Sequence, residues 1–132
     1  MWPCFYRVST KALIFDETKT KFLLMREDNG SRDFPGGGLE FGEDITESII
    51  REVKEEAGLE VTWVASAPLY FVVSYNPEHD VRLGHPFYET KVKDFNFTPS
   101  EECQEIKFVT KEEAEKMNIR PNVVAFLKHC TL

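Results

Sequence analysis

The sequence predicts an α/β fold in which a mixed β-sheet lies between helices. The chain has 132 residues, a length that suits a single domain, 1–132, with one core. Its residues are 42% hydrophobic and 13% aromatic, which indicates a globular protein rather than a disordered one. Segments with the two-residue period of strands alternate with segments of helical periodicity. That order favours a sheet covered by helices on both faces.

Two strands and a glycine-rich loop are predicted in the first part of the chain. Residues 8–16 and 21–27 have strand patterns, and the polar residues 17–20 between them form a turn. Three glycines in a row, Gly36 to Gly38, are unfavourable inside a helix or a strand. We therefore expect a loop here, whose backbone groups approach another group closely.

A helix is predicted to begin after Asp44 and to end at Ala57. Asp44 and Glu47 have the spacing of an N-terminal capping box. Gly58 is the residue type that ends helices in the left-handed conformation. On a helical wheel four apolar residues form one stripe that we expect to face the core: Ile49, Ile50, Val53 and Ala57.

Further strands are predicted after this helix. Residues 60–75 form one or two strands interrupted by Pro68, because proline cannot donate to a central sheet ladder. Residues 76–86 are at least partly loop. Residues 87–95 alternate like a strand.

The end of the chain is predicted to hold a short strand and two helices. The strand covers residues 105–109. A helix over 110–117 begins with a capping box formed by Thr110 and Glu113, and a last helix covers residues 121–130.

Cysteine usage and the amino-terminal sequence indicate a cytoplasmic protein. The three cysteines, Cys4, Cys103 and Cys130, are odd in number and far apart, so we expect reduced thiols. The first residues lack the layout of a signal peptide. No apolar run approaches the length of a membrane span, so we expect no membrane association.

The net charge of −7 is concentrated in one segment of the chain. Residues 40–60 contain eight acidic and two basic residues and therefore carry −6 of it. This distribution indicates an acidic site. Because no basic patch or stripe is evident, we expect no groove for a nucleic-acid backbone.

The acidic segment contains a motif with defined spacing. From Gly37 to Leu59 the sequence reads GGLEFGEDITESIIREVKEEAGL. A glycine is followed after five residues by Glu43, and after seven more by REVKEEAGL. This pattern resembles the Nudix box, which marks hydrolases of nucleoside diphosphates linked to another group. The resemblance implies an α/β/α sandwich in which the box forms a loop, a helix and a second loop.

Three glutamates of the predicted helix lie on one side of it. Glu52, Glu55 and Glu56 fall within an arc of roughly 100° on the helical wheel, and Glu56 overlaps the edge of the apolar stripe. Glu52 and Glu56 are spaced i, i+4, so their charges repel each other. A hard divalent cation removes this repulsion. The cluster therefore predicts a site for Mg²⁺, which prefers oxygen ligands, with Mn²⁺ as an alternative ion.

The resemblance also implies roles for individual residues of the box. Glu52 resembles the general base of the family, which also contacts metal, and Glu55 and Glu56 resemble its principal metal ligands. Arg51 matches an arginine that binds a carboxylate and orients the base, with Glu43 as its structural partner. A surface ion pair with Glu55 is the alternative interpretation of Arg51.

Two further metal ligands are expected outside the helix. Gly36 resembles the residue whose carbonyl completes the metal shell in this family, although a turn glycine fits the sequence equally well. Many members add an acidic residue from a loop beyond the sheet. We expect Glu102 to be this residue, with Glu101 and Glu105 as alternatives, and exposed acids without a role fit as well.

The nucleoside end of the substrate is less well defined by the sequence. Phe34 and Tyr75 are candidates for stacking on a base, although aromatic residues at strand spacing are typical of a core. Asn122 is a candidate for hydrogen bonding to a base edge, and the start of a helix is its alternative role.

These features predict a Mg²⁺-dependent pyrophosphohydrolase with a small nucleotide substrate, as a monomer or homodimer. Small size favours a nucleoside triphosphate or a modified one. Tyr75 and Pro77 lie near the spacings that distinguish subfamilies, so ADP-ribose and dinucleoside polyphosphates are both alternatives. A non-catalytic nucleotide-sensing module is the alternative of another class.

Overall fold

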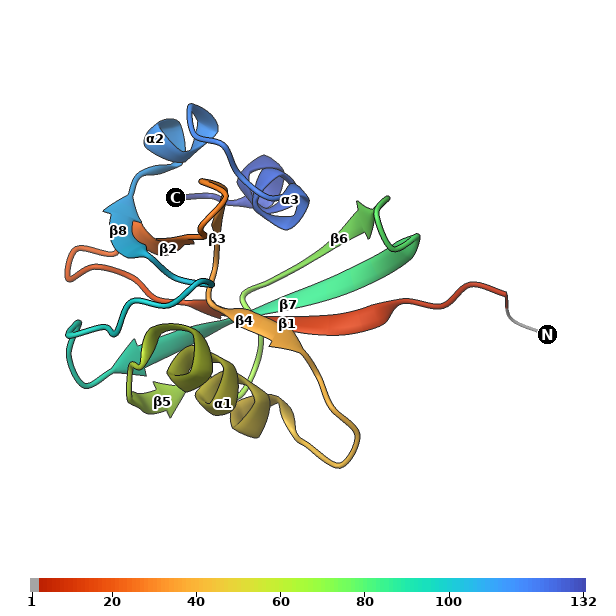
Figure 1. The fold of residues 1–132 in the computed structure, drawn as a ribbon, viewed down its shortest axis with the longest axis horizontal. Coiled ribbons are helices and arrows are strands. Elements are labelled where there is room, and N and C mark those ends of the chain that lie inside the picture. Colours follow the sequence, from red (N-terminus) through yellow and green to blue (C-terminus); the bar gives the residue numbers. More distant parts are fainter. Residues whose placement is uncertain (1–2) are drawn as a thin grey trace.

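The main β-sheet is built around one long strand, β7 (Val81–Val92). On one edge β7 pairs in parallel with β1 (Arg7–Leu13), and β1 pairs antiparallel with β4 (Gly36–Gly38). On its other edge β7 pairs antiparallel with β5 (Val61–Val64) and β6 (Tyr70–Asn76). The computed structural model, which describes residues 3–132, thus contains the mixed sheet that the sequence predicts (Figure 1).

A second, smaller sheet and three helices complete the part of the chain that is described. The small sheet is antiparallel with the strand order β3–β2–β8. None of the helices within residues 3–132 is long and apolar enough to span a membrane. The bounds of these elements are β2 Phe22–Arg26, β3 Arg32–Asp33, α1 Ile45–Ala57, β8 Glu105–Val109, α2 Lys111–Glu115 and α3 Pro121–His129.

The alternation of side chains along β1 divides the core into two clusters. Leu13 packs in a cluster that includes Phe126 of α3. Its neighbours Ala12 and Ile14 pack in a different cluster, which includes Ile49 of α1. Successive side chains of a strand point to opposite faces, so α1 and α3 cover opposite faces of the sheet. The predicted α/β/α sandwich is confirmed.

The predicted limits of α1 and the predicted start of α2 are confirmed by their capping contacts, whereas α2 ends at Glu115 instead of residue 117 and α3 ends at His129 instead of residue 130. The Asp44 side chain accepts a hydrogen bond from the backbone amide of Glu47 at 2.8 Å, and Gly58 ends α1 with φ 67°. At α2, both hydrogen bonds of the box between Thr110 and Glu113 are present. These caps satisfy backbone groups that the helix leaves without partners.

Gly36 to Gly38 form the strand β4 rather than the expected loop. Gly36 has φ 140°, and a Cβ atom placed on it would lie 2.0 Å from the carbonyl oxygen of Thr10 in β1. Such a contact is impossible, so a side chain at this position would push the two strands apart. The glycines therefore allow β4 to pair closely with β1. The low strand propensity of glycine is the reason that the sequence predicts a loop here.

The apolar stripe of α1 is rotated from the one that the wheel predicts. Ile50 is 43% exposed, whereas Ser48 is completely buried. The Ser48 hydroxyl lies 3.1 Å from the Thr10 hydroxyl of β1. Because this hydrogen bond satisfies both polar groups, a serine can occupy the core side of the helix and Ile50 faces outward.

Residues 81–86 are the first part of β7 and not a loop. They pair with β6 from Val81 opposite Asn76 to Pro86 opposite Phe71. The pairs between β7 and β1 include Gly84 but not Pro86. The missing backbone N–H of Pro86 therefore costs no pairing with β1. The glycine and the proline in this segment therefore do not interrupt the strand.

Phe34 is a core side chain rather than the base-stacking residue that we expected. It is fully buried, and its ring centroid lies 4.9 Å from those of Phe87 and Phe126 and 5.5 Å from that of Phe22. Its position just before β4 directs the ring into the α3 side of the core. A side chain buried in this way cannot reach a base in a pocket.

Replacement of Phe34 by alanine tests this assignment. We expect Phe34→Ala to lower the free energy of unfolding by ~3–5 kcal/mol, because it leaves a cavity among packed rings. Urea denaturation measures the change. Phe95→Ala is the matched control, since the Phe95 ring is 45% exposed and should cost less than about 2 kcal/mol. Equal losses in the two variants would contradict the core assignment.

Candidate functional site

Helix α1 places two glutamates against the glycine strand β4. The Glu56 carboxylate accepts a hydrogen bond from the Gly36 amide at 2.8 Å. A Cβ atom on Gly37 would lie 2.6 Å from the carboxylate carbon of Glu52. The lack of a side chain at Gly37 therefore makes room for Glu52. Glu55 lies at the outer side of the helix, with 59% of its side chain exposed.

Arg51 connects the acidic residues of the motif. Its Nε and Nη2 atoms donate to the two oxygens of Glu43 at 2.7 and 3.0 Å, a bidentate contact. Its Nη1 atom donates to Glu52 at 2.9 Å and to Glu55 at 3.3 Å. Hydrogen bonding to Arg51 lowers the pKa of Glu43 to about 2. Both contacts considered for Arg51 thus occur together, and the guanidinium holds one oxygen of Glu52 in place.

Burial and charge repulsion raise the proton affinity of the two inner glutamates. Burial raises the pKa of Glu56 to about 8, and the charges of Glu52 and Asp33 add to the increase. Burial also raises the pKa of Glu52, with a smaller contribution from Glu55 and Glu102, although Arg51 opposes the shift. A cation that takes the place of the bound protons would therefore stabilise the charged forms of Glu52 and Glu56.

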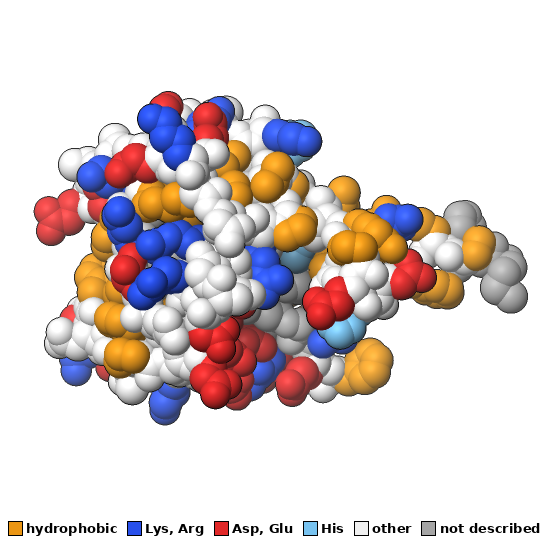
Figure 2. All heavy atoms as spheres, turned by 45° about the horizontal axis from the view of Figure 1, so that its top comes forward, with side chains coloured by type: hydrophobic (Ala, Val, Ile, Leu, Met, Phe, Trp, Pro, Cys, Tyr) orange, Lys and Arg blue, Asp and Glu red, His pale blue; other side chains and the backbone are white. Residues whose placement is uncertain are grey.

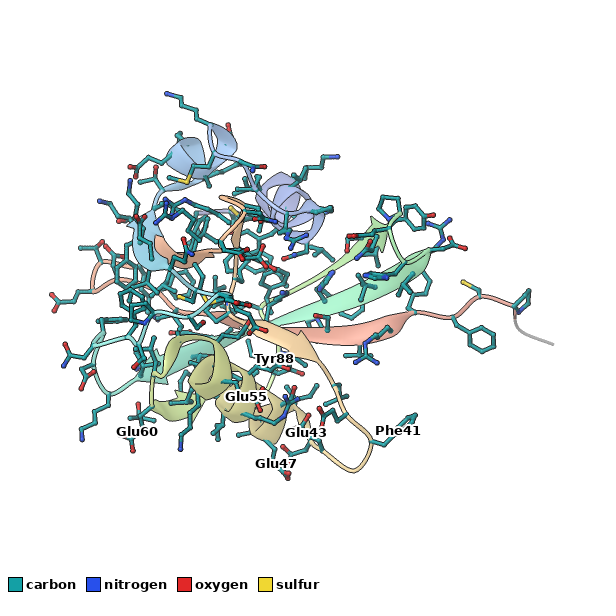
Figure 3. The ribbon with its side chains drawn as sticks, viewed as in Figure 1. Phe41, Glu43, Glu47, Glu55, Glu60 and Tyr88 are labelled. Carbon is teal, nitrogen blue, oxygen red and sulfur yellow. The ribbon has the colours of Figure 1, made fainter. Side chains whose placement is uncertain are left out.

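The acidic residues form a visible surface on the molecule. Figure 2 shows acidic side chains gathered at the lower middle of that view, where α1 lies. In Figure 3, Glu43 and Glu55 lie beside α1, whereas Glu47 and Glu60 point away from the core. Glu43 and Glu55 therefore lie along the site, whereas Glu47 and Glu60 extend into solvent.

The donor set fits a hard divalent cation, although its members have protein partners here. Within residues 3–132, no three acidic, histidine or cysteine side chains converge closely enough to hold a metal ion as they stand. Arg51 bridges Glu52 and Glu55, and the Gly36 amide, rather than its carbonyl, contacts Glu56. Carboxylate oxygens are the ligands that Mg²⁺ prefers, and Glu52 and Glu56 both lie against the bare backbone of β4.

The loop after β7 brings Glu102 towards this cluster. Glu102 is exposed, and its charge contributes to the raised pKa of Glu52. Glu105, by contrast, is engaged in β8, where it accepts a hydrogen bond from Arg32 at 2.7 Å. The Glu101 carbonyl accepts a hydrogen bond from the Asp28 amide. Of the three acids considered, Glu102 is the one whose charge is close enough to raise the pKa of Glu52.

A pocket of about 410 Å³ lies on the α3 side of β1. Its walls come from β1, from the turn after β6 and from the start of α3, and they include Asn122. Lys11 and Asp33 line the same pocket, and their charges act on the pKa of Glu56. The pocket therefore lies close to the carboxylate cluster, across β1 and β4.

A hydrogen-bond network sets the orientation of Asn122 in this pocket. The Asn122 Nδ2 atom donates to Asp33 at 3.0 Å, and Lys11 donates to the other oxygen of Asp33 at 3.2 Å. The Asn122 Oδ1 atom is buried and has no hydrogen-bond partner. A carboxylate only accepts hydrogen bonds, so the amide of Asn122 must turn its nitrogen towards Asp33. Asn122 is thus left with an unsatisfied acceptor.

Tyr75 borders the pocket, but its ring is engaged elsewhere. The Arg82 guanidinium stacks on the ring at 4.5 Å, and the Tyr75 hydroxyl donates to Asp80 at 2.9 Å. Arg82 and Asp80 both line a separate groove, on the other side of the β6–β7 hairpin. Asn122 therefore lines the pocket with an Oδ1 atom that has no partner, whereas Arg82 covers the ring of Tyr75.

Comparison with known proteins decides the family. A sequence model of the NUDIX domain matches residues 5–130. The chain belongs to the NUDIX domain family. The family predicted from the motif between Gly37 and Leu59 is confirmed, and so is its enzyme class: Nudix hydrolases act on nucleoside diphosphate-linked compounds.

The fold of this Nudix domain is similar to several solved structures. A MutT protein from Methanosarcina mazei Go1 is 23% identical with a TM-score of 0.73, covering 97% of this chain and 92% of that one. A NUDIX hydrolase from Nitrosomonas europaea is 20% identical with a TM-score of 0.74, covering 94% and 87%. An ADP-ribose pyrophosphatase from Streptococcus suis is 22% identical with a TM-score of 0.66, covering 97% and 96%. At these identities the likeness shows the fold. Among curated proteins, none matches the chain.

Three polar residues of the Nudix pocket were not predicted from the sequence. Lys11 and His85 are 4% and 2% exposed, and both line the pocket with Asp33. A lysine inside the strand pattern of β1 is the one signal that pointed to a buried polar site, since lysine is rarely buried without a partner. Nothing in the sequence indicates that His85 is buried. Its partners, Ser74 and the Ser9 carbonyl, lie in two other strands.

The pH dependence of stability tests the burial of His85. Burial lowers the pKa of His85 to about 4, with a contribution from the charge of Lys11. The unfolded chain therefore binds a proton first as the pH falls from 6.5 towards 4, and stability is lost over that range. We expect His85 to contribute a loss on the order of 3 kcal/mol.

The measurement is the difference in unfolding free energy between wild type and His85→Gln at several pH values. This difference should shrink as the pH falls from 6.5 to 4. His129→Gln is the control, because His129 is exposed at the end of α3. A difference that does not change with pH would contradict a neutral buried His85.

Proposed function

We propose that this Nudix domain cleaves a phosphoanhydride bond of a nucleoside triphosphate, or a modified one, in a reaction that depends on Mg²⁺. Mn²⁺ is an alternative ion. The observation that carries the proposal is the placement of Glu52 and Glu56 against β4 with a polar pocket close to them. The carboxylates suit a divalent cation that binds the phosphates of the substrate. The pocket suits its nucleoside.

Glu52 is the general base of the proposed reaction. Arg51 binds only one of its oxygens, at 2.9 Å, and Glu43 in turn holds Arg51. The second oxygen of Glu52 can therefore take a proton from the attacking water while the side chain keeps its orientation. The raised pKa of Glu52 makes it a stronger base than an exposed glutamate.

The residues that would hold the cation are the carboxylates of Glu52, Glu55 and Glu56, the Gly36 carbonyl and Glu102. When bound, the divalent ion neutralises phosphate charge and lowers the pKa of the attacking water. Support comes from the raised pKa of Glu56, which reflects a buried carboxylate with like-charged neighbours. Such a group gains from exchanging its proton for a cation.

Asn122 recognises the base of the substrate in this proposal. Asn122 lines the pocket, and Asp33 holds its Nδ2 atom, whereas its Oδ1 atom is buried and has no partner. A rotation of this side chain on binding would turn Oδ1 towards a donor group on the base. The pocket volume of about 410 Å³ suits one nucleoside better than a substrate with two. This is the feature that favours a nucleoside triphosphate over ADP-ribose or a dinucleoside polyphosphate.

Replacement of Glu52 by glutamine tests its catalytic role. We expect Glu52→Gln to lower kcat ~10²–10⁴-fold, because the amide keeps the shape of the carboxylate but cannot accept the proton. The rate of nucleotide release is measured with and without Mg²⁺, and the melting temperature reports the fold. Glu60→Gln is the control, since the Glu60 side chain is 71% exposed and lies outside the cluster. Wild-type rates for Glu52→Gln would disprove its role as the base.

A hydrolysis panel tests the proposed substrate class. The panel contains the nucleoside triphosphates, oxidised nucleoside triphosphates, ADP-ribose, dinucleoside polyphosphates and nucleotide sugars, each with Mg²⁺ and with Mn²⁺. We expect the highest kcat/KM for a nucleoside triphosphate and an increase in its KM in Asn122→Ala. Preference for ADP-ribose or a dinucleotide would contradict the substrate assignment. If the protein binds a member of the panel but hydrolyses none, the non-catalytic nucleotide-sensing module would be favoured over an enzyme.

A further inference from the structure

The outward side of β6 is apolar along its whole length. Leu69, Phe71, Val73 and Tyr75 occupy alternate positions and are 38–62% exposed. The residues between them face the core, where Val72 is buried. A strand with one face in water normally carries polar residues on that face. β6 also pairs with β7 alone within residues 3–132, so its outer edge is an unpaired strand edge.

This apolar surface continues across the sheet to β1. Val73 lies opposite Gly84 of β7, and Gly84 lies opposite Val8 of β1. The ring of Phe71 covers Gly84, where a Cβ atom would lie 2.9 Å from it. Helix α1 covers the same face of β1 at Thr10, which is completely buried, but Val8 is 37% exposed. Figure 1 shows β6 and the adjoining ends of β7 and β1 extending beyond α1.

An open groove of about 830 Å³ extends the same surface towards the N-terminal arm. Its walls are residues 3–8, 39–41 and 80–82. Phe5 and Phe41 are 79% and 109% exposed, and Figure 3 shows Phe41 pointing away from the body of the protein. Figure 2 shows hydrophobic side chains along this projecting end. The uncovered sheet face consists of Phe5, Tyr6, Val8, Phe41, Leu69, Phe71, Val73 and Tyr75.

The charged residues beside the uncovered sheet face balance one another. Arg7 and Arg82 line the groove together with Glu40 and Asp80. The surface is therefore neutral, although the whole chain carries a charge of −7. Arg82 and Asp80 are held in place by their contacts with Tyr75. A surface with both signs in fixed positions can pair with a copy of itself, whereas a nucleic acid or an anionic membrane requires a basic surface.

We propose that the uncovered sheet face is the contact surface of a homodimer. The exposed fractions of its eight side chains correspond to an area on the order of 900 Å² in each copy. This is comparable with the ~800 Å² that each partner of a stable complex buries. A two-fold axis brings the face against itself.

Sedimentation velocity of the wild-type chain is the first test. We expect a species of about 31 kDa, twice the 15.3 kDa of the chain, at ~100 µM protein, with dissociation on dilution. A single 15.3 kDa species over the whole concentration range would disprove the dimer.

Charged substitutions locate the interface. We expect Val73→Glu and Phe71→Glu each to weaken dimerisation at least ~30-fold, because they bury an unpaired charge in the contact. Val124→Glu is the matched control, since Val124 is 41% exposed on α3 outside the face, and it should dimerise like wild type. Melting temperature and circular dichroism show that each variant is folded. We also expect Phe41→Ser to weaken dimerisation, because Phe41 is fully exposed and lines the groove of the same face.

Other outcomes would overturn the proposal. If folded Val73→Glu and Phe71→Glu dimerise like wild type, the interface lies elsewhere. If Val124→Glu disrupts the dimer as strongly, α3 rather than β6 forms the contact. If the wild type is a monomer and sediments with vesicles of phosphatidylcholine and phosphatidylserine, the face binds a membrane and not a second copy.

Discussion

The close packing of β4 between β1 and α1 holds both the sheet and the carboxylate cluster together. Gly36 approaches the Thr10 carbonyl so closely that a Cβ atom would lie 2.0 Å from it, and Gly37 makes room for Glu52 on the other side. The Gly36 amide then binds Glu56 at 2.8 Å. Since these contacts require bare backbone, larger residues here would move α1 away from the sheet. The position of the glutamates therefore depends on a strand that has no side chains.

The cluster keeps like charges close together, and the surrounding groups limit the cost. Arg51 donates to Glu43, Glu52 and Glu55, so one cation offsets several carboxylates. Glu56 lies deeper, and its pKa rises to about 8 because burial disfavours its charged form. A structure in this state carries unfavourable electrostatic energy at its acidic site. In the proposed reaction, binding of a cation would release that energy and so would connect the stability of α1 with the chemistry of the box.

The two-residue period of β1 serves two sites at once. Thr10 faces α1 and hydrogen-bonds Ser48, whereas Lys11 faces the pocket and binds Asp33. Neighbouring residues of β1 therefore contact the helix that carries the carboxylates and the pocket, and the charges of Lys11 and Asp33 act on Glu56. The same alternation along β6 buries Val72 and exposes Val73. Strand geometry thus assigns neighbouring residues to the core, to the site or to an external surface.

The sequence by itself determined the family, the limits of α1 and the grouping of its glutamates, because helix caps and helical spacing are local properties. Only the tertiary structure decided that Gly36 to Gly38 form a strand, that Phe34 belongs to the core and that Ile50 faces outward. It also brought Lys11, Asp33, His85 and Asn122 together around one pocket. These residues are far apart in the chain, and their burial and hydrogen bonding depend on strand pairing between distant segments. No local pattern contains that information.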